Sequence, residues 1–161
     1  MNSPLPSATE TPAKKRTLVP RDAATLIVVD RSSDAAAVKE PRILMGHRSG
    51  KHVFMPNTFV FPGGRLDPED VGIPAHGDLR APVMQRLQRK ASARKARALA
   101  CAAIRETFEE TGLIIGAPHN GNYAAAKVTP DWEPFFATGM PPRLDCLDYV
   151  ARAVTPPNNV R

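Results

Sequence analysis

The chain has 161 residues, of which 42% are hydrophobic and 6% aromatic, with 17 prolines and a formal net charge of +6. This length leaves room for one domain with a real core, and two cysteines exclude a disulfide framework and favour a reducing compartment. The positive charge favours anionic partners such as nucleotides and phosphates.

Residues 1–20 are rich in Ser, Pro, Thr and Ala and include the basic run 14–16, so we predict a disordered tail. The apolar run 23–29 is too short to span a membrane, and its β-branched residues predict a buried strand. No other segment has the length and apolarity to cross a bilayer. We therefore expect no membrane partner and a cytoplasmic location.

Two further strands are expected before the middle of the chain. Residues 42–45 should pair antiparallel to the first strand, and residues 58–61 form a third that Pro62 ends. Gly63 and Gly64 then predict a tight turn. Glycine lets the backbone approach a ligand closely, so a carbonyl of this turn could reach a bound metal.

The segment 71–97 is predicted to start as a loop and to continue as helix, because residues 83–111 contain neither Gly nor Pro. Either one long helix or two helices broken near Ser92 would fit, and Arg94 within the apolar stripe favours the break. Four cations share one side: Arg86, Arg89, Lys90 and Arg97. The simpler interpretation is a solvated face, and the alternative is a clamp for a polyanionic substrate.

The helix that ends near Thr111 carries two contrasting faces. Glu106, Glu109 and Glu110 lie on one face at positions i, i+3 and i+4, and the opposite face is apolar. Gly112 suits the left-handed position past a helix, so these acids lie at the negative pole of the helix dipole, where each costs roughly 0.3–1 kcal/mol. Arg105 can neutralise one of them. With neither His nor Cys on this face, Mg²⁺ or Mn²⁺ is the cation expected to neutralise the rest.

The sequence patterns after the acidic helix predict secondary structure less clearly. Residues 113–115 could begin a strand, the aromatic cluster 132–136 is expected to close the core, and residues 150–155 predict a strand ended by prolines.

The acidic helix and the glycine turn together resemble a known motif. The run Arg105-Glu106-x-x-Glu109-Glu110-x-Gly112-Leu113, after Pro62-Gly63-Gly64, resembles the Nudix hydrolase box. It departs from that box in three ways. Asp70 stands where the box has Glu, Thr107 stands where it prefers an apolar residue, and about residues 71–97 are inserted. A box interrupted in this way is similar to the branch of peroxisomal acyl-coenzyme A diphosphatases.

The resemblance implies an α/β fold, a Nudix-like α/β/α sandwich with a mixed sheet. It implies metal ligation by Glu106, Glu109, Glu110 and the carbonyl of Gly64, with catalytic roles for Glu109, Glu110 and Arg105. Asp70 is the box-matching acid. Arg48 and Arg65 are candidates for holding substrate phosphates, because they lie near the glycine turn in sequence.

The activity implied is metal-dependent hydrolysis of a diphosphate linkage in a nucleotide-containing small molecule. Coenzyme A or acyl-coenzyme A would give 3′,5′-ADP and a phosphopantetheine product; ADP-ribose, dinucleotides and nucleoside triphosphates are further candidates. We expect a Nudix domain over residues 21–161 that is incomplete at its C-terminus, with an exposed sheet edge open to homodimerisation. The alternatives are a catalytically incompetent remnant and, less favoured, a nucleic-acid-binding module built on the basic stretch.

Overall fold

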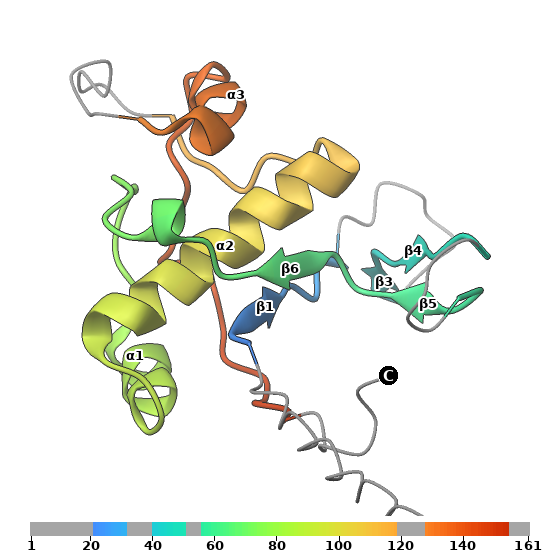
Figure 1. Ribbon diagram of the computed structural model, residues 1–161, viewed down its shortest axis with the longest axis horizontal. Helices are drawn as coiled ribbons and strands as arrows, with labels where there is room; N and C mark the ends of the chain where they lie inside the picture. Colours follow the sequence, from blue (N-terminus) through green and yellow to red (C-terminus); the bar gives the residue numbers. More distant parts are fainter. Residues whose placement is uncertain (1–20, 32–39, 51–55, 119–127, 155–161) are drawn as a thin grey trace, which may run out of the picture.

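A computed structural model describes residues 21–31, 40–50, 56–118 and 128–154, so the predicted tail 1–20 lies outside the described residues. The helices are α1 (Ala81–Gln88), α2 (Ala93–Thr111) and α3 (Glu133–Phe136), with 3₁₀ turns η1 (Pro68–Asp70) and η3 (Pro130–Trp132). The strands are β1 (Ala23–Thr25), β2 (Val29–Asp30), β3 (Arg42–Ile43), β4 (Gly46–His47), β5 (Phe59–Val60) and β6 (Gly63–Arg65). Figure 1 shows α2 running diagonally beside β1 and β6, with α1 at one of its ends and α3 near the other.

The break expected near Ser92 separates α1 from α2. The Ser92 side chain accepts a hydrogen bond from the backbone N–H of Lys95, which caps the first turn of α2. At the other end Gly112 has φ 72°, and its N–H donates to the carbonyl of Phe108. Both ends of α2 are therefore set by local sequence signals, and the sequence-based prediction of two helices is confirmed.

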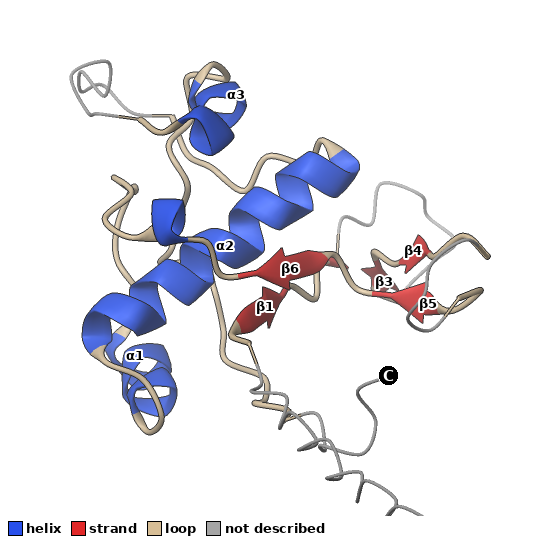
Figure 2. Cartoon of the chain, viewed as in Figure 1, coloured by secondary structure: helices blue, strands red, loops and turns tan. Residues whose placement is uncertain are grey.

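The strands form three separate two-stranded antiparallel ladders, β1 with β6, β2 with β3, and β4 with β5 (Figure 2). The expected antiparallel pairing of residues 42–45 with the first apolar run is confirmed by β2 and β3. The α/β class holds, although the parallel pairing expected of a mixed sheet is limited among the described residues to the isolated bridge between His76 and Arg143.

The predicted tight turn at Gly63 and Gly64 is wrong. These residues form β6, in register with β1 so that Gly64 faces Ala24 and Gly63 faces Thr25. Gly63 has φ 149°, and a Cβ there would overlap the carbonyl oxygen of Ala24. Glycine is required at this position by the close approach of two strands rather than by a turn.

The core lies under α2, whose predicted apolar face contributes Ala100, Cys101 and Ile104. It consists of Ile73, Leu79, Val83, Ala100, Cys101, Ile104, Trp132, Phe135 and Leu144. The aromatic cluster closes this core as expected, with Trp132 and Phe135 in edge-to-face contact at 5.4 Å between ring centroids. Burial raises the pKa of the Cys101 thiol to about 12, so this cysteine is a packing residue.

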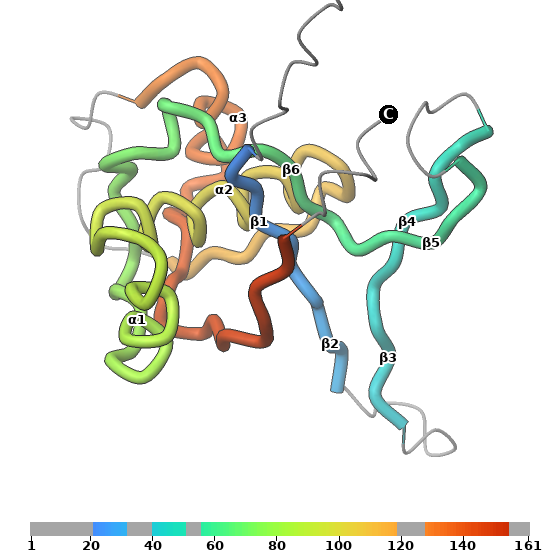
Figure 3. The backbone as a smooth tube through the Cα atoms, turned by 60° about the horizontal axis from the view of Figure 1, so that its bottom comes forward, coloured from blue at the N-terminus to red at the C-terminus, as the bar shows by residue number. Residues whose placement is uncertain are grey.

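The strands beyond the core are much more exposed than predicted. The run 23–29 is not a buried strand but divides into β1 and β2, and Val29 is exposed. Ile43 is 53% exposed and Phe59 69% exposed, on ladders that extend away from the helical body in Figure 3. Residues 150–154, the described part of another predicted strand, form no ladder. Short two-stranded ladders lack a covering layer and cannot bury both faces of a strand.

Among the described residues, no helix combines the length and apolarity needed to cross a membrane.

Candidate active site

The ladder of β1 and β6 places two glycines directly against the acidic face of α2. A Cβ on Gly64 would overlap the carboxyl group of Glu106, so only glycine leaves room for that side chain. The backbone N–H of Gly63 donates to Oε2 of Glu110 at 3.2 Å. The two halves of the interrupted motif therefore meet in space, although Gly63 and Glu110 are 47 residues apart in sequence.

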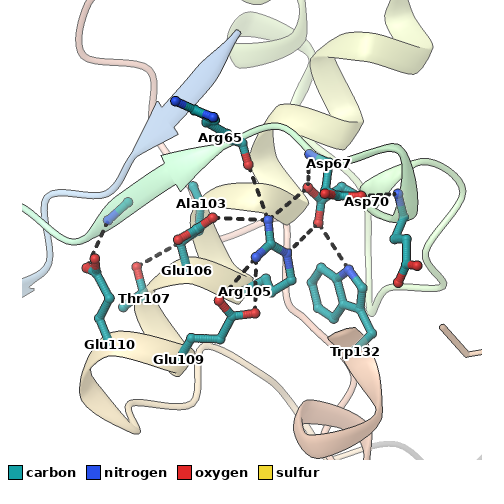
Figure 4. A network of polar contacts seen from close by, with 12 residues as sticks. Arg65, Asp67, Asp70, Ala103, Arg105, Glu106, Thr107, Glu109, Glu110 and Trp132 are labelled. Atoms are coloured by element: carbon teal, nitrogen blue, oxygen red, sulfur yellow. Dashed lines mark hydrogen bonds and ion pairs between the residues drawn. The ribbon is translucent and has the colours of Figure 1, made fainter. Parts of the chain in front are cut away.

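The three acids of α2 differ in burial and in partners (Figure 4). Glu106 is half-buried and lies 3.2 Å from Arg105, whereas Glu109 and Glu110 are exposed. Burial raises the pKa of Glu106, and repulsion by Glu109 and Glu110 adds to this rise, while the opposing charge of Arg105 is insufficient to reverse it. Glu106 is thus a carboxylate whose negative charge is poorly compensated by the protein itself.

Arg105 is the centre of the polar network. Its Nε and Nη2 donate to the two oxygens of Asp70 at 2.9 and 3.2 Å, and Nη1 donates to both oxygens of Glu109 at 3.0 and 3.2 Å. Burial alone would lower the pKa of Arg105, but hydrogen bonds and charges from Asp70 and Glu109 outweigh it and raise that pKa. Arg105 therefore stays charged and orients Glu109.

Asp70, expected only as the box-matching acid, is fully buried in this network. Its carboxylate also accepts from the N–H of Asp67, which forms a reciprocal capping box around η1, and from Nε1 of Trp132. Sequence reasoning missed both partners. The run Asp67-Pro-Glu-Asp70 is a detectable capping signal, whereas no local pattern connects Asp70 with Trp132, 62 residues later.

Thr107, another departure from the motif, is also explained by the structure. Its side chain is fully buried, and its hydroxyl donates to the carbonyl of Ala103 at 2.7 Å. A buried hydroxyl bonded within its own helix leaves no unsatisfied polar group.

The two arginines proposed for substrate phosphates are placed differently. The carbonyl of Arg65 accepts from Arg105 at 3.2 Å, while its exposed side chain points away from the acids in Figure 4. Arg48 lies half-buried in the hairpin between β4 and β5, joined to Thr58 through its backbone. The structure therefore brings together Gly64, Asp70 and the residues of α2, and leaves Arg48 on a separate ladder.

The basic side of the insertion lies at the opposite end of α2 from the acids. Along α2, Arg97 and Glu106 are about 14 Å apart. Arg97 is engaged elsewhere, donating to the carbonyl of Ile73 at 2.6 Å and pairing with Asp78. Arg97 is therefore engaged within the insertion, and the clamp for a polyanionic substrate stays a prediction.

The donor chemistry of the acidic end fits a hard divalent cation. It offers carboxylate oxygens, and the missing side chain at Gly64 leaves room for that of Glu106. Within the described ranges, no three His, Cys, Asp or Glu side chains already converge on one point. The contacts explain this, because Arg105 holds Glu109 and the N–H of Gly63 holds Glu110. The raised pKa of Glu106 marks the charge that a cation would compensate.

Comparison with known proteins supports the same family. The chain is 31% identical over 138 aligned positions to an acyl-coenzyme A diphosphatase of Xenopus laevis, covering 63% of this chain and 36% of that protein. It also superposes on the crystal structure of a NUDIX hydrolase from Alicyclobacillus acidocaldarius with a TM-score of 0.56 and 28% identity, covering 87% of this chain and 64% of that one. No protein-family model matches.

In both sequence and fold, the chain is thus similar to Nudix hydrolases. It spans 36% of the length of the Xenopus relative. Within the Nudix box of this chain, the long insertion does not separate the two halves, because the ion pair between Asp70 and Arg105 joins them across it.

The two glycines of this Nudix box give a matched pair of variants. Gly64→Ala should leave the fold intact, because the overlapping atoms are the end of the flexible Glu106 side chain, but it should displace that carboxylate and weaken cation binding. Gly63→Ala should destabilise the fold, because there the overlap is with backbone of β1 and φ is 149°. Thermal unfolding with and without Mn²⁺ checks both. A Gly64→Ala protein with an unchanged Mn²⁺-induced rise in Tm would contradict this account.

The raised pKa of Glu106 predicts a pH-dependent cost to stability. The unfolded chain loses this proton first, so the free energy of unfolding falls as pH rises from about 4 through the folded pKa, and the loss persists above it. In EDTA at pH 7, Glu106→Gln should therefore be more stable than wild type, and the difference should disappear in acid. Tm measured across this pH range checks the sign. A Gln variant that is less stable at pH 7 would refute it.

Proposed function

We propose that this chain hydrolyses a diphosphate linkage in a nucleotide-containing small molecule with the help of a divalent cation. The observation that carries the proposal is that Gly63 and Gly64 lie directly against Glu110 and Glu106. The buried ion pair between Arg105 and Asp70 stabilises this arrangement. Nudix hydrolases generally use divalent metals, and the oxygen-only donor set here favours Mg²⁺ or Mn²⁺.

In the proposed mechanism, Glu106, Glu109 and Glu110 would hold the cation, with the carbonyl of Gly64 as the further ligand that the resemblance to the box implies. When bound, the cation neutralises phosphate charge and lowers the pKa of water, supplying a nucleophile near neutral pH. Arg105 holds Glu109 through both carboxylate oxygens and so fixes its direction. Glu109 and Glu110 are exposed at the end of α2, where either can accept a proton from the attacking water.

We propose coenzyme A or an acyl-coenzyme A as the substrate, cleaved to 3′,5′-ADP and a phosphopantetheine product. The name of the Xenopus relative supports this choice, as does the insertion within the box. We also propose one Nudix domain over residues 21–161, working in a reducing compartment such as the cytoplasm. Two free cysteines, Cys101 and Cys146, are consistent with that location.

The test is hydrolysis of coenzyme A and of ADP-ribose by the purified 161-residue chain, with Mg²⁺, Mn²⁺ or EDTA. We expect cation-dependent release of 3′,5′-ADP from coenzyme A, and a lower kcat/KM for ADP-ribose. Preference for ADP-ribose would replace the substrate proposal while keeping the diphosphatase. A folded chain that binds Mn²⁺ but cleaves neither compound would favour the catalytically incompetent alternative.

A further inference from the structure

We infer that Trp132 is a positioning residue for the carboxylate site, acting through Asp70 and Arg105; its effect on turnover rests on the proposed function. Trp132 lies in η3, after the Nudix box, and is fully buried. Its Nε1–H donates to Oδ1 of Asp70 at 3.1 Å. Figure 4 shows the indole on the side of Asp70 away from Glu106 and Glu110, so Trp132 cannot act by touching the cation or the substrate bound there.

The hydrogen bonding of Asp70 shows why this one donor matters. Oδ1 accepts from Arg105 at 2.9 Å and from Trp132, and Oδ2 accepts from Asp67 at 2.8 Å and from Arg105 at 3.2 Å. A carboxylate has about four acceptor positions, and here each oxygen has two donors. The carboxylate is therefore fully satisfied and held in a single orientation without solvent.

The guanidinium group of Arg105 couples the orientation of Asp70 to that of Glu109, because it binds both carboxylates. Arg105 binds Asp70 on one edge and both oxygens of Glu109 through Nη1, while Nη2 also donates to the carbonyl of Arg65. These bonds share one rigid fork, so a rotation of the Asp70 carboxylate tilts the fork and moves Glu109. Glu109 is exposed, and within the described part of the chain its side chain is bound by Arg105 alone, so it follows Arg105.

The indole also packs within an aromatic cluster. Its ring meets Phe135 edge to face at 5.4 Å, and Phe135 meets Phe108 of α2 at 5.1 Å. The segment that follows the box therefore packs against α2, and the indole N–H of Trp132 faces Asp70. This arrangement differs from a purely structural tryptophan, whose ring would matter but whose N–H would not.

Trp132→Phe separates these roles, because it removes the N–H and keeps most of the buried ring. We expect the apparent affinity for Mn²⁺ to fall about tenfold, the range typical of partners behind metal ligands, and kcat to fall with it. KM for the nucleotide at saturating Mn²⁺ should be unchanged. Phe135→Leu is the matched control, since it disturbs the same cluster without removing a donor to Asp70; its Mn²⁺ affinity should stay at the wild-type value.

A spectroscopic readout makes the test independent of turnover. The Nε–H resonance of Arg105 in ¹⁵N NMR reports its bond to Asp70. It should shift and exchange faster with solvent in Trp132→Phe but not in Phe135→Leu. Asp70→Asn should weaken Mn²⁺ binding similarly, and its combination with Trp132→Phe should be less than additive.

The outcomes are distinct. Weaker Mn²⁺ binding and a shifted Arg105 resonance in Trp132→Phe would uphold the positioning role. If the wild-type chain then shows no turnover, the proposed activity is rejected while the positioning role stands. An unchanged resonance and Mn²⁺ affinity, or equal changes in Phe135→Leu, would overturn the positioning role whatever the activity.

Discussion

Glu110→Gln is expected to lower cation-dependent hydrolysis of coenzyme A about 100-fold or more while leaving the fold intact. Glu110 is exposed, and its side chain accepts a hydrogen bond from the N–H of Gly63 at 3.2 Å. The amide oxygen of Gln can still accept that bond, but it lacks the charge that a divalent cation requires. Steady-state kinetics at several Mg²⁺ concentrations measure the loss, and circular dichroism reports the fold.

The matched control for this variant is Glu133→Gln. Glu133 is an exposed acid in the first turn of α3, away from the Nudix box. It should retain wild-type kinetics. Near-normal turnover in Glu110→Gln, with Glu133→Gln unchanged, would remove Glu110 from the proposed site.

Arg105→Ala is expected to cost about 3–5 kcal/mol in the free energy of unfolding, the largest stability effect that we predict for a single residue. Removing the guanidinium leaves the fully buried carboxylate of Asp70 without a compensating charge. The chain would lose a large share of a typical stability of about 5–15 kcal/mol. Urea titration followed by tryptophan fluorescence measures the change, because Trp132 contacts the same carboxylate.

Arg42→Ala provides the comparison for that result. Arg42 pairs with Asp30 at 2.6 Å, but both side chains are largely exposed, so its loss should cost no more than about 1 kcal/mol. Asp70→Asn added to Arg105→Ala should recover part of the lost stability by removing the stranded charge. Equal costs for Arg42→Ala and Arg105→Ala would show that the buried network contributes nothing beyond an ordinary surface pair.

The glycines illustrate how far sequence reasoning extends at a single place. Gly64 was correctly expected to permit a close approach, but what approaches it here is the carboxyl group of Glu106. The expected turn is a strand, because pairing with β1 overrides the local preference of two glycines for loop conformations. Tertiary pairing routinely overrides such preferences in strands.

The sequence by itself determined α2, the break at Ser92, the Gly112 cap and the single acidic face. All of these follow from helical periodicity and capping, whose causes lie within a few residues. Only the tertiary structure decided that Asp70 is buried, that Arg105 divides its fork between Asp70 and Glu109, and that Trp132 completes the carboxylate. These contacts join segments far apart in sequence, and they form because a buried charge must find every donor that it needs, wherever along the chain that donor lies.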